Sequence, residues 1–218
     1  MTRYTGLLIL LLPVQVSFAQ IDLNKIPAAG KNKEAFIPKG CTLLSSVEED
    51  FNKDNLIDQA MVIEQNGQAL LILFKQADNS YKVSLKTQQL FTNDDSEGYF
   101  RFETLGKRTK TLQVVFVDES IRNLGSKYYC YFRFQNNDWY LIGYTNELTK
   151  VTEPDMGVWG SDINLVTGAR EDYKLIIDPN SDILEGPKKV TKRSKKKPKP
   201  LIALSAFKIN SDEWKVTE

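Results

Sequence analysis

An acidic loop in the first third of the chain has the residue spacing of a calcium-binding loop. Oxygen-bearing side chains stand at relative positions one, three, five and nine of this loop, as Asp50, Asn52, Asp54 and Asp58. Alternate residues of a tight loop can converge on one hard cation, and the backbone carbonyl of Leu56 would add a further oxygen. The spacing therefore predicts calcium as a cofactor, bound by these five residues. The alternative is an acidic turn that only connects two strands.

The surroundings of this loop distinguish it from an EF-hand. Position six is Asn55, which tolerates the positive φ that such a loop requires. Position twelve, where an EF-hand carries a bidentate Glu, is Met61. The phrase Gly40–Leu44, the acidic loop and the apolar run after it together resemble an FG-GAP repeat. In that family an acidic loop of this spacing binds calcium between two strands, which implies the same five ligands here.

A second resemblance covers more of the chain. The segments Asp138–Gly143 and Asp162–Gly168 look similar to short exported bacterial proteins of unknown function. This resemblance implies an envelope location and no particular activity.

The chain contains no histidine, and this removes several kinds of catalysis. Ser-His-Asp and Cys-His nucleophiles, His-ligated zinc and imidazole proton relays all need the missing side chain. Chemistry based on carboxylates, Lys or Tyr stays open, for example with Glu48, Glu49 and Asp50. We therefore expect a protein without catalytic function, with a carboxylate-dependent hydrolase as an alternative.

A basic tract near the C-terminus is the second candidate for binding. Residues 188–199 hold eight Lys or Arg and no acid, so they could attract a polyanion by releasing its counterions. No aromatic residue interleaves the tract, so stacking on nucleic-acid bases is not expected. An anionic envelope component or a protein is the predicted partner. The alternative is a disordered, self-repelling loop between strands.

Strict alternation over residues 127–134 predicts a strand with one apolar and one polar face. Cys130 falls on the apolar face, whereas Tyr129 and Tyr131 fall on the polar face, where a partner could reach them. The predicted partner-binding residues are Tyr129, Tyr131, Lys192, Arg193, Lys195, Lys196 and Lys197.

The N-terminus predicts export. Residues 1–19 combine Arg3, a short apolar run and small residues before Gln20, which is typical of a cleavable signal peptide. No later segment is apolar for long enough to span a bilayer as a helix. A periplasmic or secreted location permits a disulfide between Cys41 and Cys130, and two buried thiols are the alternative.

Apolar runs separated by turn residues predict the fold class. Asn66-Gly67, Asn136-Asn137 and Thr167-Gly168 each lie between two strand-like runs, as in consecutive hairpins. We expect a linker at 20–40 and an all-β domain at 41–218, with a basic loop at 188–199. The architecture expected is an antiparallel sandwich or a strongly bent sheet.

These features predict a non-catalytic binding protein of the bacterial envelope, stabilised by calcium. The acidic excess outside the basic tract supports a second class, a periplasmic inhibitor or immunity protein that blocks a toxic or lytic enzyme.

Overall fold

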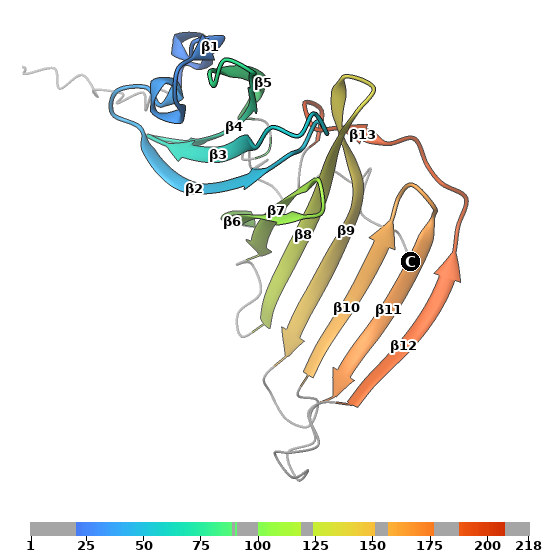
Figure 1. Cartoon of the computed structure of the whole chain (residues 1–218). Coiled ribbons are helices and arrows are strands. Elements are labelled where there is room, and N and C mark those ends of the chain that lie inside the picture. Colours follow the sequence, from blue (N-terminus) through green and yellow to red (C-terminus); the bar gives the residue numbers. More distant parts are fainter. Residues whose placement is uncertain are drawn as a thin grey trace, which may run out of the picture.

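The computed structural model describes residues 21–88, 90, 100–118, 124–150, 157–176 and 188–207. The predicted signal peptide lies outside these residues. Two antiparallel sheets dominate the described chain (Figure 1). Within the same residues, no helix has the length and apolar character needed to cross a membrane.

The first sheet has five strands in the order β1-β5-β4-β3-β2, and all neighbours are antiparallel. Its strands are β1 (Ala29–Gly30), β2 (Thr42–Glu49), β3 (Asp58–Glu64), β4 (Gln68–Lys75) and β5 (Tyr81–Thr87).

The second sheet has eight strands, seven of them in the order β12-β11-β10-β9-β8-β7-β6, with β13 paired to β9. Its strands are β6 (Phe100–Arg108), β7 (Thr111–Asp118), β8 (Leu124–Gln135), β9 (Asp138–Lys150), β10 (Gly157–Asn164), β11 (Ala169–Ile176), β12 (Lys188–Lys195) and β13 (Ile202–Ala203).

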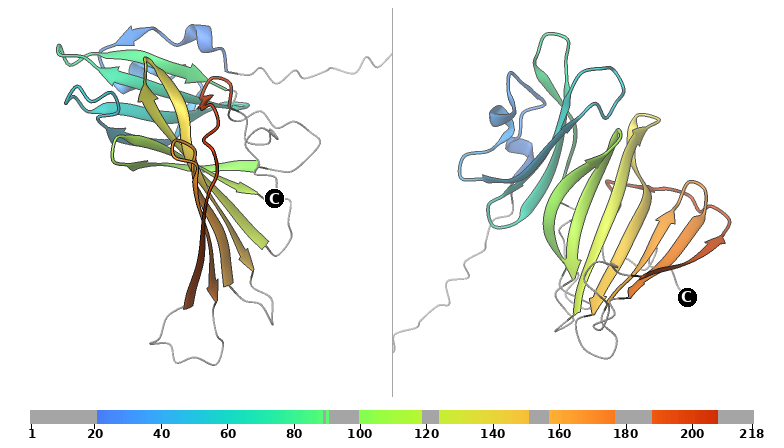
Figure 2. Two further views of the ribbon diagram at one scale, coloured as in Figure 1. Left: turned by 90° about the vertical axis from the view of Figure 1, so that its right-hand side faces the viewer. Right: turned by 60° about the horizontal axis from the view of Figure 1, so that its bottom comes forward.

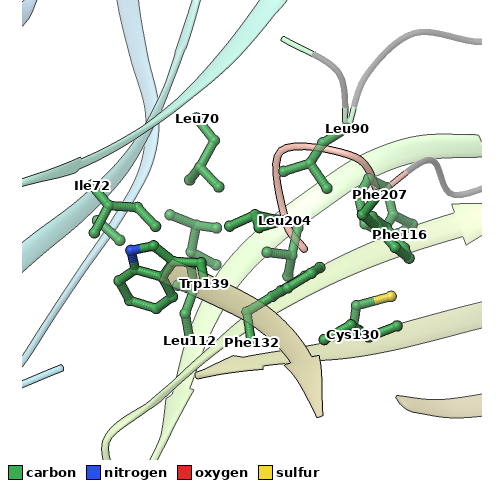
Figure 3. Close-up of a cluster of buried hydrophobic side chains, with 14 of the residues drawn as sticks. Leu70, Ile72, Leu90, Leu112, Phe116, Cys130, Phe132, Trp139, Leu204 and Phe207 are labelled. Carbon is green, nitrogen blue, oxygen red and sulfur yellow. The ribbon is translucent and has the colours of Figure 1, made fainter. Parts of the chain in front are cut away.

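The two sheets pack through one hydrophobic core, which confirms the predicted antiparallel sandwich. β3 and β4 contribute Ala60, Val62, Leu70 and Ile72 to this core, and the second sheet contributes the larger aromatic residues. Figure 3 shows Trp139 directed toward the first sheet, where its ring meets Phe51 at a centroid distance of 5.5 Å. Burial of these aromatic side chains supplies much of the force that holds the sheets together.

The N-terminal segment forms a further layer on the outer face of the first sheet. Two short 3-10 helices, η1 (Leu23–Lys25) and η2 (Lys33–Phe36), and strand β1 bring Ile26 and Phe36 onto the sheet, where both are buried. The segment predicted as a linker at 20–40 thus packs on the first sheet in its described part, residues 21–40, through Ile26 and Phe36. Isolated apolar residues among polar neighbours gave too weak a periodic signal to indicate this packing.

The turns agree with the predicted hairpins, with differences in detail. Asn136 and Asn137 both have positive φ, 51° and 61°, and connect β8 to β9 in two residues. The turn after β3 takes three residues, since Glu64 pairs with Gln68, and in it Gly67 has positive φ and Asn66 does not.

The basic tract forms a strand where a loop was predicted. β12 pairs with β11 along its whole length, and Arg193 and Lys192 stand opposite Glu171 and Asp172. Opposite charges on neighbouring strands offset the self-repulsion that favours a loop. Beyond Lys195 the chain continues as an exposed extended segment to Pro200.

The second sheet extends beyond the sandwich. β10, β11 and β12 project away from the first sheet as a curved, open sheet (Figure 2). Among the described residues of these three strands, Ile163 is the one that is buried in the inter-sheet core, and the side chains of β11 are almost all half-buried. This part of the molecule therefore offers two accessible faces. We call the face that continues the inter-sheet core the inner face and the opposite one the outer face.

Candidate binding site

A groove of about 610 Å³ crosses the outer face of the second sheet, and we call it the cationic groove. Its size is within the range of small-molecule binding sites. Residues from the β6–β7 turn and from β8 through β12 line it. The lining residues that the argument uses are Arg108, Tyr131, Arg133, Gly143, Asp162, Arg193 and Lys195.

One cross-strand row of lining residues in the cationic groove runs over three strands. Gly143 of β9 stands opposite Asn164 of β10, which in turn stands opposite Ala169 of β11. A Cβ atom at Gly143 would lie 2.6 Å from the carbonyl oxygen of Ile163, which is closer than real side chains permit. Any residue other than glycine would therefore require a backbone shift at this position of the groove.

Positive charge exceeds negative charge in this groove. Arg193 donates to Glu171 at 2.7 Å, so these two charges neutralise each other. Arg108, Arg133 and Lys195 have no carboxylate within ion-pair distance among the described residues. Asp162 is the one unpaired carboxylate in the described lining, so three unpaired cations face a single unpaired acid and the groove has a net positive charge that would attract an anionic group.

One wall of the groove is a chain of hydrogen-bonding side chains that starts from Tyr131. The Tyr131 hydroxyl is 3.5 Å from Gln113 Nε2 and 3.4 Å from Thr145 Oγ1. Thr145 is in turn 3.5 Å from Asp162 Oδ1. The Arg108 guanidinium lies 6.0 Å from the centroid of the Tyr131 ring. These contacts hold the ring as a half-buried platform beside the unpaired arginines.

The structure brings three of the predicted partner-binding residues together and separates the others. Tyr131, Arg193 and Lys195 line the cationic groove. Lys192 points to the inner face, next to Asp172. Lys196 and Lys197 lie on the exposed segment after β12.

Tyr129 belongs to a separate network on the outer face. Tyr173 of β11 reaches across Gly160 of β10 and donates to Glu147 Oε1 of β9, and Tyr129 also bonds Glu147. Burial, the negative charge of Glu147 and this hydrogen bond raise the pKa of Tyr129 to about 12. Both tyrosines therefore stay protonated near neutral pH.

The predicted calcium loop is held by hydrogen bonds from its own backbone. Asp50 Oδ1 accepts from the Asp54 amide at 3.0 Å, and Asp54 Oδ1 accepts from the Leu56 amide at 2.8 Å. Asn52 Oδ1 also accepts from the Asp54 amide, at 3.1 Å. Asn55 has a φ of 69°, as the spacing required. These bonds draw three of the five predicted ligands around one bend.

Two other features of the loop limit its fit to a metal. The Lys110 ammonium is 2.9 Å from Asp50 Oδ2, where it already supplies positive charge. Within the described residues, no group of three or more acidic side chains is arranged to hold a metal ion. The donor set of carboxylates, an amide and a carbonyl suits calcium in its chemistry. Binding would require the displacement of Lys110 and a shift of Asp58.

Asp58 anchors the base of the loop through hydrogen bonds to the backbone. Its buried carboxylate accepts from the amides of Phe51 at 2.9 Å and Lys75 at 3.0 Å, so it joins the loop to β4. Burial raises the pKa of Asp58 to about 6, although these backbone hydrogen bonds oppose the shift.

The two cysteines are free thiols, so the disulfide is not formed in this structure. Cys130 is buried in the inter-sheet core, whereas Cys41 packs against the separate cluster on the outer side of the first sheet. Cys41 Sγ lies 3.7 Å from Gln65 Oε1. The first sheet stands between the two clusters and keeps the thiols apart.

Two of the three unpaired cations of the cationic groove were absent from the predicted set. Arg133 alternates onto the same strand face as Tyr131, and this pattern could have identified it. Arg108 lies at the end of β6, a strand that was not predicted, so its place beside Tyr131 had no sequence signal.

Comparisons with known proteins do not assign this chain to a family. No family model, curated protein or solved structure matches it. The FG-GAP resemblance therefore stays a prediction.

Proposed function

We propose that this chain is an exported, non-catalytic binding protein of the bacterial envelope that holds an anionic envelope component in the cationic groove. The observation that carries this proposal is that Arg108, Arg133 and Lys195 line one groove together with Tyr131 and have no carboxylate partners among the described residues. A carboxylate or phosphate entering the groove would gain charge-assisted hydrogen bonds from the arginines.

The groove supports a discrete anion site better than it supports diffuse attraction. Tyr131 and Arg133 are half-buried, so their positions are restricted by the sheet before a ligand arrives. An arginine held in place loses less conformational entropy on binding than a free lysine does. The exposed segment 196–199, by contrast, presents lysines without a surrounding wall.

The test compares two variants of equal charge. One carries Arg108→Gln, Arg133→Gln and Lys195→Gln, and the matched control carries Lys196→Gln, Lys197→Gln and Lys199→Gln. Binding of the mature protein to peptidoglycan sacculi and to phosphatidylglycerol vesicles is measured by co-sedimentation. We expect the groove variant to bind about tenfold or more weakly to one of these probes, which corresponds to about 1.4 kcal/mol.

The control variant separates a site from general attraction. It should lose less than the groove variant, because its lysines lie outside the groove. Equal losses in the two variants would show that counterion release alone drives binding and would overturn the proposal. Circular dichroism of both variants checks that the sheets are intact.

We further propose that the acidic loop binds calcium weakly and thereby stabilises the first sheet. The support is that the side-chain oxygens of Asp50, Asn52 and Asp54 all accept hydrogen bonds from the amides of one bend, and that Asn55 has positive φ. The Lys110 ammonium competes for Asp50, so we expect affinity in the weak extracellular range of about 0.1–1 mM.

A further inference from the structure

A second groove lies on the inner face of the projecting sheet, opposite to the cationic groove. It has a volume of about 450 Å³ and crosses β8, β9, β10 and β11. Two neighbouring cross-strand rows of side chains form its walls, since residues paired across strands share a face. We call it the inner groove.

One wall of the inner groove is apolar and aromatic. Trp159 of β10 stands opposite Leu148 of β9, and Leu148 stands opposite Ser126 of β8. The Lys174 ammonium lies 4.7 Å from the centroid of the Trp159 ring, and Lys174 does not line the groove. This cation–π contact fixes the ring beside the groove without filling it.

The other wall is polar and rigid. Asn146 of β9, Ser161 of β10 and Asp172 of β11 stand opposite one another across the strands. Asn146 Oδ1 accepts from the Ser161 amide at 3.1 Å, which directs its own amide donors away from the backbone. Asp172 Oδ1 accepts from Ser161 Oγ and from Arg170 Nε. Its second oxygen has no hydrogen-bond partner among the described residues.

The inner groove differs from the cationic groove in charge. Glu147 contributes to its lining but directs its carboxylate to the opposite face, where Tyr173 binds it. Asp172 is then the charged side chain in the groove, and Arg170 pairs with it at 2.7 Å. Lys174 and Lys192 border this face but do not line the groove, so the lining itself lacks the unpaired cations of the cationic groove, which favours an uncharged ligand over an anion.

We propose that the inner groove binds the ring of a neutral sugar. A pyranose has an apolar C–H face and a rim of hydroxyl groups, so it can stack on Trp159 while its hydroxyls bond Asn146 and Asp172. The donors of Asn146 and the acceptor of Asp172 lie along one wall, which matches hydroxyls that both donate and accept. This site is independent of the anion site proposed above.

The test uses the tryptophan fluorescence of the mature protein. Of three tryptophans, Trp139 is buried in the core and Trp214 lies outside the described residues. In a Trp214→Phe background, a ligand-dependent change in emission therefore comes mainly from Trp159, because Trp139 is shielded from the ligand. The probes are glucose, N-acetylglucosamine and their short β-linked oligomers. We expect a saturable change in emission with at least one probe, in the millimolar range.

Three variants decide whether the signal comes from the inner groove. Sugar binding measured by calorimetry should vanish in Trp159→Ala, persist with reduced affinity in Trp159→Phe and weaken about tenfold in Asp172→Asn. Lys195→Gln, on the opposite face, should bind sugar as the wild type does. Absence of saturable binding to every probe, or unchanged binding in Trp159→Ala, would overturn the proposal. If the wild type bound sugar but neither anionic probe, the function proposed for the cationic groove would be overturned and the sugar site would stand.

Discussion

Two pairs of strands in this molecule have opposite environments. β3 and β4 are buried on both faces, between the N-terminal segment and the second sheet, and nearly all of their side chains are inaccessible. β10 and β11 project beyond the sandwich and are half-exposed on both faces. Both pairs are antiparallel hairpins with similar backbones, so the contrast resides in the side chains and their neighbours.

The difference assigns stability and binding to separate regions. The buried pair carries continuous apolar runs, as strands covered on both sides require. The projecting pair carries polar and aromatic residues that pair across strands and line the two grooves. Substitutions in the first region should therefore change the free energy of unfolding, and those in the second should mainly change binding.

The largest expected effect is in the buried pair. Leu71→Ala should lower the free energy of unfolding by about 2–5 kcal/mol, because its fully buried side chain would leave a cavity beside the N-terminal segment. The matched change in the projecting pair, Leu175→Ala, should cost less than about 1 kcal/mol. Urea unfolding measures both values. Similar losses at the two positions would contradict the division between the regions.

The pH dependence of stability should differ in sign between the regions. Because burial raises the pKa of Asp58 to about 6, the folded protein keeps a proton that the unfolded chain loses near pH 4. The stability of the wild type relative to Asp58→Asn should therefore fall by about 2–3 kcal/mol as the pH rises from 4 to 7. If the free energy of unfolding of the wild type instead rose relative to that of Asp58→Asn between pH 4 and pH 7, the expectation would be contradicted.

Asp172 of the projecting pair serves as the control. Burial acts to raise its pKa, but hydrogen bonds from Ser161 and Arg170 outweigh it and lower the pKa. The stability of the wild type relative to Asp172→Asn should then be constant above pH 4 and fall as the pH decreases below that value.

Calcium should act on the first sheet and leave the grooves unchanged. At about 5 mM calcium we expect about 1–2 kcal/mol of stabilisation, seen as a rise in Tm of a few degrees. Asp54→Ala should abolish the rise, and Lys110→Gln should enlarge it, since the competing ammonium is gone. A flat Tm in both the wild type and Lys110→Gln would rule out the calcium site.

The smallest expected effect concerns the network over Gly160. A Cβ atom at this position would meet the far end of the Tyr173 ring, so Gly160→Ala should separate Tyr173 from Glu147. We expect a loss of about 1 kcal/mol, the net worth of one hydrogen bond. Tyr173→Phe should cost a similar amount, and the double variant should cost no more than either. Fully additive losses would show that the two residues act separately.

The sequence was sufficient to predict the fold class and much of the hairpin pattern. Asn136-Asn137 is a strong local signal because both residues adopt positive φ, and the alternation over 127–134 follows from the pleat of a single strand. These features depend on neighbours in the chain. The position of Cys130 in the core followed from the same alternation.

The features that were missed depend on contacts between distant segments. β12 is a strand because β11 supplies acidic partners, and no local property of a lysine-rich tract indicates this. The N-terminal layer depends on a few apolar residues that cover the side of β3 and β4 facing away from the second sheet. Both grooves draw residues from four or more strands, so their composition could be known only after the strand order was known.

The lysine-rich strand β12 also affects how copies of this protein meet. β12 is an edge strand of the eight-stranded sheet, and five of its eight residues are Lys or Arg. A second copy that added its own β12 alongside would place like charges opposite one another, which disfavours growth of a continuous sheet across molecules. High salt, which screens this repulsion, is therefore the condition under which edge-to-edge aggregation of this protein would first become favourable.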